Sequence, residues 1–119
     1  MCAFRSSSAH EAAVLRALLE ADEVALAVPV RIEILGGASK TDRIRLRRVL
    51  SALPVLYPTD DTWAMVDGWI DTASTAGQRF GFGDLLIGAL ARETGSLLWS
   101  LDADFSRMAR LGFVDLYAP

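Results

Sequence analysis

Cysteine and histidine are almost absent from this 119-residue sequence, which has one of each. The single thiol, Cys2, excludes an internal disulfide framework and a zinc site built from several cysteines of one chain. The segment Ser8-Ala9-His10-Glu11 has the pattern of a capping box, so we expect His10 in the exposed first turn of a helix. Catalytic triads that need histidine and histidine-rich metal sites are therefore poor candidates for this protein.

Long apolar runs are also absent, and none approaches the ~20 residues that a membrane helix needs. The first eight residues contain no apolar core of a secretory signal. We therefore expect a cytoplasmic protein that does not act at a membrane. Apolar residues make up 52% of the chain, which suits one compact domain with a real core.

Positive charge is scarce overall but concentrated in one place. The net charge of −3 gives no general attraction to nucleic acid. The exception is a basic segment within residues 40–48, which contains Lys40, Arg43, Arg45, Arg47 and Arg48. Two interpretations stay open for these residues: a solvated helix face, or a surface that contacts phosphates or an acidic partner.

Amphipathic helical segments alternate with short apolar segments along the chain. The spacing predicts helices over 8–21, 30–35, 41–53, 60–76, 84–94 and 105–110, and strands over 24–28, 54–58, 96–100 and 113–117. This alternation indicates an α/β fold, a three-layer sandwich in which helices flank a short, mainly parallel sheet. No repeat or linker divides the chain, so we expect a single domain.

The same periodicity predicts which side chains of two helices face the core. On the helix over 41–53, the expected inward residues are Ile44, Val49, Leu50 and Leu53. On the helix over 60–76, the expected inward residues are Trp63, Val66, Ile70 and Ala73. Trp69 lies on another face of that helix and could mark a dimer surface.

Four carboxylates stand inside apolar segments: Glu33, Asp84, Asp102 and Asp104. An ionised oxygen is costly to bury unless something compensates it. Each has a structural explanation, because the aspartates suit helix caps or turns and Glu33 can extend to the surface. If they converge instead, they repel one another unless a cation neutralises them, and oxygen ligands suit Mg²⁺ or Mn²⁺. Phosphodiester hydrolysis is the natural chemistry of such a site.

Three motifs, in this order, resemble those of the PIN-domain nucleases, and most closely the VapC toxins of bacterial toxin–antitoxin pairs. They are Ile32-Glu33-Ile34-Leu35-Gly36-Gly37, then Phe82-Gly83-Asp84-Leu85-Leu86-Ile87-Gly88-Ala89-Leu90-Ala91, then Leu98-Trp99-Ser100-Leu101-Asp102-Ala103-Asp104-Phe105. The resemblance covers the chain from Ser8 to Tyr117. It implies a ribonuclease that depends on Mg²⁺ or Mn²⁺.

The resemblance also implies roles for particular residues. Glu33, Asp84 and Asp102 correspond to the family's catalytic, metal-binding acids. Asp104 would be a further metal ligand, and Ser100 an auxiliary residue that orients a water molecule. Arg79 joins Arg43, Arg45, Arg47 and Arg48 as candidates for RNA binding. A cognate antitoxin protein and homodimerisation are implied as well.

One departure concerns the N-terminus. PIN domains open with a hydrophobic strand that ends in a metal-binding Asp, whereas Met1-Cys2-Ala3-Phe4-Arg5 resembles the segment that follows it. We therefore expect residues 1–119 to form one PIN-like domain without that strand. The given sequence could start at an internal methionine, the flanking strands could close the gap, or a partner could supply a strand.

Two alternative functions stay open. One is a PIN-like module that binds RNA or an antitoxin without cleavage, and the other is a flavodoxin-like or response-regulator-like domain.

Overall fold

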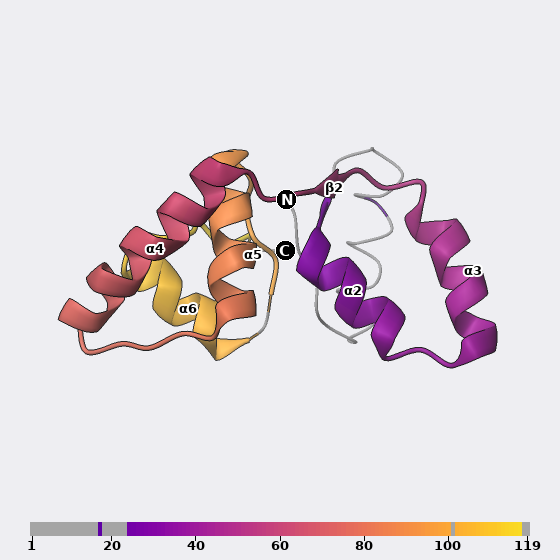
Figure 1. Cartoon of the computed structure of the whole chain (residues 1–119), viewed down its shortest axis with the longest axis horizontal. Helices are drawn as coiled ribbons and strands as arrows, with labels where there is room; N and C mark the ends of the chain where they lie inside the picture. The colour runs from indigo at the N-terminus through magenta and orange to yellow at the C-terminus, as the bar shows by residue number, and fades with distance from the viewer. Residues whose placement is uncertain (1–16, 18–23, 101, 118–119) are drawn as a thin grey trace.

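The computed structural model describes residue 17, residues 24–100 and residues 102–117 (Figure 1). The elements in chain order are β1 (Leu26–Ala27), α2 (Val28–Gly36), α3 (Lys40–Leu50), β2 (Val55–Leu56), α4 (Asp60–Thr75), α5 (Phe82–Glu93) and α6 (Ala103–Arg110). The helix predicted over 8–21, apart from residue 17, and the N-terminal departure lie outside the described residues. None of the helices within that part is long and apolar enough to cross a membrane.

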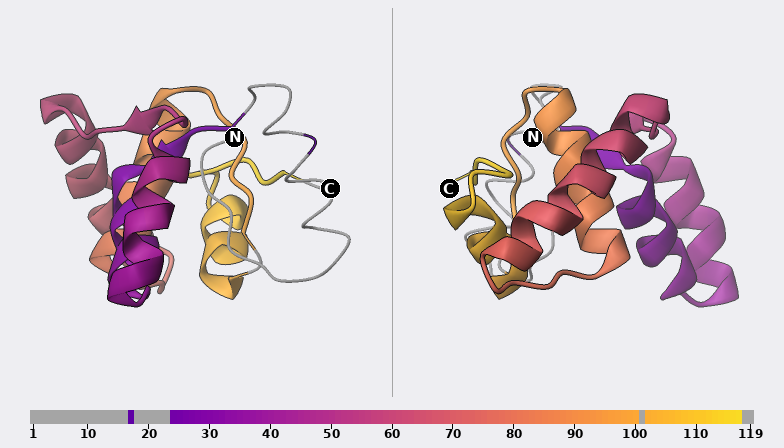
Figure 2. Two further views of the ribbon diagram at one scale, coloured as in Figure 1. Left: turned by 90° about the vertical axis from the view of Figure 1, so that its right-hand side faces the viewer. Right: turned by 60° about the vertical axis from the view of Figure 1, so that its left-hand side comes forward.

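Helix α5 is the centre of the fold. Its residues from Leu85 to Ala91 are all buried, as expected for a helix that is apolar on every side. It packs against α2, α4 and α6 and also contacts β1. In Figure 1 and in the right-hand view of Figure 2, α6 lies on one side of α5 and α2 and α3 lie on the other.

Parallel strand pairing is present but short. β1 pairs with β2 in parallel, with Leu26 opposite Val55 and Ala27 opposite Leu56. A second parallel contact is a single bridge between Leu98 and Leu116. The expected α/β class with a short parallel sheet is confirmed, although the pairing is shorter than the predicted strands. Strand β1 ends where helix α2 begins, at Val28, because the proline that follows suits the first turn of a helix.

The buried face of α4 differs from the predicted one. On α4, Thr62, Val66 and Ala73 are buried, and Met65 and Trp69 pack against the core. Trp63 and Ile70 are 42% and 52% exposed, so their assignment to the core is wrong. Trp69 stacks on Phe113, with ring centroids 4.3 Å apart. Val66 and Ala73 are buried as predicted, and the face differs where a polar residue, Thr62, takes the place that was given to Trp63.

Thr62 is fully buried because its hydroxyl group has partners on two elements. Its Oγ1 accepts a hydrogen bond from the backbone N–H of Thr59 at 2.9 Å, which caps the start of α4. The same hydroxyl donates to Oε1 of Glu93 at the end of α5. A buried hydroxyl with such partners costs little, so a polar residue can occupy a core position and tie α4 to α5.

Of the residues predicted to face inward on the helix over 41–53, Leu50 and Leu53 do lie in or against the core, but Ile44 and Val49 do not. Ile44 and Val49 are 60% and 59% exposed, whereas Leu50 is buried. Helix α3 packs mainly against α2, so its contact face is narrow and most of its surface meets solvent.

Gly88 allows α5 and α6 to approach closely. A Cβ at this position would lie 2.5 Å from Cε of Met108, 3.1 Å from Val114 and 3.2 Å from Trp69. Met108 is on α6 and is fully buried, so it has little room to move. The glycine is therefore needed for packing.

We expect Gly88→Ala to destabilise the protein by about 1–2 kcal/mol, because the cost of overpacking exceeds the gain in helix propensity. Gly68→Ala on α4 is the matched control, since a Cβ there meets nothing within 4 Å. That control should stabilise the protein by up to about 1 kcal/mol. Urea unfolding of both variants measures the difference, and equal stabilisation by the two would contradict the packing argument.

Candidate metal centre

Three of the four predicted acids come together in the structure. One carboxylate oxygen from each of Asp84, Asp102 and Asp104 lies within 4.8 Å of the other two. All three residues are partly buried. Asp84 belongs to α5, whereas Asp102 and Asp104 belong to the start of α6. The cluster therefore joins two helices whose sequences are separated by a buried segment around Leu98.

Local helix geometry explains why these carboxylates can approach. Asp84 lies in the first turn of α5, after the N-cap residue Gly81. Asp102 is the N-cap of α6, and its Oδ1 accepts a hydrogen bond from the backbone N–H of Asp104 at 2.9 Å. Helix N-termini favour negative charge, so both helices offset part of the repulsion among the three side chains. The cap of α6 is thus Asp102 and not Asp104, and this capping role is compatible with the place of Asp102 in the cluster.

Ser100 supports this turn from the preceding strand segment. Its Oγ accepts a hydrogen bond from the backbone N–H of Asp102 at 3.0 Å. This contact fixes the backbone that carries the Asp102 carboxylate. The auxiliary role predicted for Ser100 thus has a structural basis as a support of Asp102, while its action on water stays a prediction.

Arg107 is a residue of this region that the sequence analysis did not single out. Its Nη2 donates to Oδ1 of Asp104 at 2.6 Å, and its Nη1 donates to Oε1 of Gln78 at 2.6 Å. Arg107 holds the pKa of Asp104 below its ordinary value; Asp84 acts in the same direction, and burial opposes them. The spacing of three residues between Asp104 and Arg107 on one helix was the available sequence signal.

Glu33 is not part of the cluster. It lies on α2 and is exposed, and its carboxylate is not in the group of oxygens within 4.8 Å of one another. The backbone carbonyl of Glu33 accepts from Gly37 N–H at the end of α2. Its role as a metal ligand or catalytic acid stays a prediction, which requires either an intervening water molecule or a movement of the side chain.

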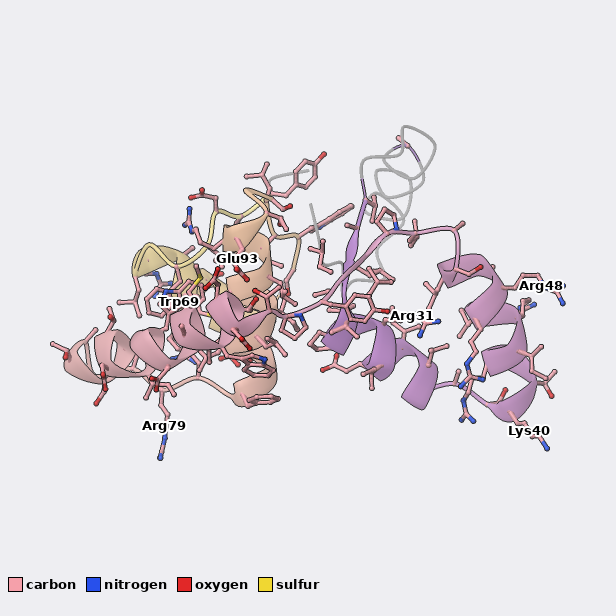
Figure 3. The ribbon with its side chains drawn as sticks, turned by 45° about the horizontal axis from the view of Figure 1, so that its top comes forward. Arg31, Lys40, Arg48, Trp69, Arg79 and Glu93 are labelled. Atoms are coloured by element: carbon pink, nitrogen blue, oxygen red, sulfur yellow. The ribbon has the colours of Figure 1, made fainter. Side chains whose placement is uncertain are left out.

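The predicted RNA-binding residues of α3 differ in their surroundings. Arg43 is partly buried and donates to the backbone carbonyls of Leu35 and Ala38, both at 3.0 Å, so it attaches α3 to the end of α2. Arg45 is exposed and pairs with Asp42 at 3.3 Å. Arg47 and Arg48 are exposed, and Figure 3 shows Arg48 projecting away from the helix. The three exposed arginines Arg45, Arg47 and Arg48 are together named the α3 arginines below.

Arg79 lies in the loop before α5 and projects into solvent (Figure 3). The same loop borders a cavity of about 640 Å³ between α4 and the start of α5. Val66, Ala73 and Phe80 are among its lining residues, and the three clustered aspartates are not. This cavity is mainly apolar and is distinct from the acidic cluster.

The chemistry of the cluster fits a hard divalent cation. Its donors are carboxylate oxygens only, which suit Mg²⁺ or Mn²⁺ and not the nitrogen and sulfur ligands typical of zinc sites. Three ionised carboxylates at such short separations gain most from a small ion of charge +2. The arrangement therefore defines an α/β domain with a cluster of three carboxyl groups that could hold a divalent cation.

The chain belongs to the PIN-domain family, whose model, described as "PIN domain", matches residues 2–111. The chain is 34% identical over 113 residues to the VapC ribonuclease Mb1587 of Mycobacterium bovis and to ribonuclease VapC11 of Mycobacterium tuberculosis. In each case the similarity covers 91% of this chain and 84% of the relative. The flavodoxin-like alternative is therefore wrong.

Solved structures give the same fold. The chain is similar to a structure of VapBC2 from Rickettsia felis bound to a DNA fragment from its promoter, with a TM-score of 0.75 and 18% identity, covering 92% of this chain and 85% of that one. It is also similar to VapBC-1 from nontypeable Haemophilus influenzae, with a TM-score of 0.64 and 19% identity, covering 78% and 72% of the two chains.

We expect Asp84→Asn to weaken Mn²⁺ binding about tenfold or more, because it removes one of three clustered charges. Glu33→Gln should weaken binding less than Asp84→Asn does, because Glu33 is not one of the three clustered acids. Titration calorimetry or electron paramagnetic resonance of free Mn²⁺ measures both effects. Asp67→Asn, an exposed position on α4, is the charge-matched control. Equal effects of Asp84→Asn and Asp67→Asn would refute the assignment of the cluster.

Proposed function

We propose that this protein is a metal-dependent endoribonuclease of the VapC toxin type, which hydrolyses RNA phosphodiesters with Mg²⁺ or Mn²⁺. The observation that carries the proposal is the convergence of Asp84, Asp102 and Asp104 in a chain of the PIN-domain family. The ribonuclease names of relatives at 34% identity support the same activity.

Asp84, Asp102 and Asp104 would hold the cation, with Glu33 as a further acid at a greater distance. A divalent ion at such a centre lowers the pKa of water and stabilises charge that develops on a phosphoryl group. The residues of this chain provide a fixed set of oxygens for that ion. Ser100 and the backbone N–H of Asp104 hold Asp102 from two sides, so its carboxylate needs little rearrangement when the ion binds.

Two partners extend the proposal. The solved relatives are described as VapBC structures, and we infer that a VapB-like antitoxin protein binds this chain.

Homodimerisation is supported by an exposed apolar surface on α4 and α5. Trp63 and Phe82 stack there with ring centroids 5.8 Å apart, although they are 42% and 66% exposed. Exposed aromatic pairs of this kind favour contact with another protein surface.

The competing interpretation is a PIN-like module that binds RNA or an antitoxin without cleavage. It has less support, because three carboxylates form a compact cluster and the named relatives are ribonucleases. The two interpretations differ in whether RNA is hydrolysed when a divalent cation is supplied.

We expect the purified chain to cleave labelled single-stranded RNA with Mg²⁺ or Mn²⁺ and to lose this activity when the ion is chelated. Asp84→Asn should lower the rate by at least about a hundredfold, since it removes a charge that holds the ion. Gel analysis of the products over time provides the measurement, and Asp67→Asn should retain the wild-type rate. Metal-independent cleavage, or cleavage that survives Asp84→Asn, would contradict the proposal.

The α3 arginines should contribute to RNA binding through the phosphates. Replacing Arg45, Arg47 and Arg48 together by Gln removes up to three phosphate contacts. For single-stranded RNA, the slope of log K against log salt should then become shallower by about 2. Fluorescence anisotropy at several salt concentrations measures this slope. An unchanged slope would show that these residues form only a solvated face.

A further inference from the structure

Arg107 is held in place more firmly than an ordinary surface arginine. Its guanidinium group donates to Asp104 and to Gln78, both at 2.6 Å. The same group lies over the ring of Phe80, 4.6 Å from the centroid. These contacts come from α6 itself and from the loop between α4 and α5. Arg107 is therefore pre-organised beside the acidic cluster, and little conformational entropy is lost when it binds a further group.

The guanidinium group of Arg107 also has N–H donors left with which to bind another group. Arginine has five N–H donors, and contacts with described residues use one on Nη1 and one on Nη2. The side chain is 31% exposed, so solvent reaches it. A fixed guanidinium group with remaining donors matches the geometry of a phosphate group, which it can bind through two oxygens.

The charge of Arg107 affects the cation as well. The positive charge of Arg107 offsets part of the negative charge of the acidic cluster, because its guanidinium group contacts Asp104. Arg107 and a divalent cation also compete for the same carboxylate, because Nη2 already occupies Oδ1 of Asp104. The ion therefore binds Asp104 more weakly than it would without the arginine.

We propose that Arg107 binds an RNA phosphate beside the metal centre and that it weakens cation binding by competing for Asp104. This inference rests on the proposed nuclease function. Arg107 thus lowers the affinity for the ion and at the same time provides a cationic group that positions the substrate. A purely structural ion pair between Asp104 and Arg107 would have neither effect.

The test uses the full chain and two binding measurements that need no turnover. The probes are Mn²⁺ alone, followed by electron paramagnetic resonance, and a short single-stranded DNA oligonucleotide with Mn²⁺, followed by fluorescence anisotropy. Arg107→Gln should tighten Mn²⁺ binding about three- to tenfold, because the competing charge is lost. It should weaken oligonucleotide binding about tenfold, because a charge-assisted phosphate contact is lost.

Two further variants make the result specific. Arg110→Gln removes the same charge from an exposed position on α6 and should change neither affinity. Arg107→Lys keeps the charge without the guanidinium fork, so Mn²⁺ affinity should stay near that of the wild type and oligonucleotide binding should be partly restored. If Arg107→Lys and Arg107→Gln weaken Mn²⁺ binding equally, Arg107 only holds Asp104 in place and the inference fails.

The failure of this inference is distinguishable from failure of the proposed function. Wild-type protein that binds both probes, with Arg107→Gln indistinguishable from Arg110→Gln, overturns the role of Arg107 alone. Wild-type protein that binds neither Mn²⁺ nor the oligonucleotide overturns the proposed function and this inference together.

Discussion

Repulsion among three carboxylates is the constraint around which this structure is arranged. Asp84, Asp102 and Asp104 bring oxygens within 4.8 Å of one another, which is unfavourable unless the surroundings supply positive charge. Three sources are present: the N-termini of α5 and α6, the backbone N–H that Asp102 accepts from, and the guanidinium group of Arg107. The positions of both helices therefore determine whether the cluster can exist.

The core fixes those positions. Helix α5 is surrounded by apolar neighbours, so it has little freedom to rotate or slide. Gly88 sets how closely α6 approaches α5, because Met108 fills the space that a side chain at Gly88 would occupy. Packing around one glycine in the middle of α5 thus controls the separation of carboxylates near the start of both helices. The hydrogen bond between Thr62 and Glu93 adds a polar constraint at the other end of α5.

The sequence predicted the order of elements and most of the cluster, because apolar periodicity and carboxylates in apolar segments are local signals. It failed where a tertiary partner decided the outcome. Thr62 is polar, and only its contact with Glu93 explains why it replaces Trp63 in the core. The role of Glu33 stays a prediction, because no local pattern specifies the distance between α2 and α6. Arg107 was missed because its partner Gln78 is distant in sequence.

The N-termini of α5 and α6 bear on whether the chain folds before or after it binds an ion. Since much of the compensation for the acidic cluster comes from the polypeptide itself, folding does not have to wait for an ion. Loading can then be a separate and reversible step, governed by the free concentration of the ion in the surroundings. Newly made chains could accumulate in an ion-free, folded form and become competent together when that concentration rises.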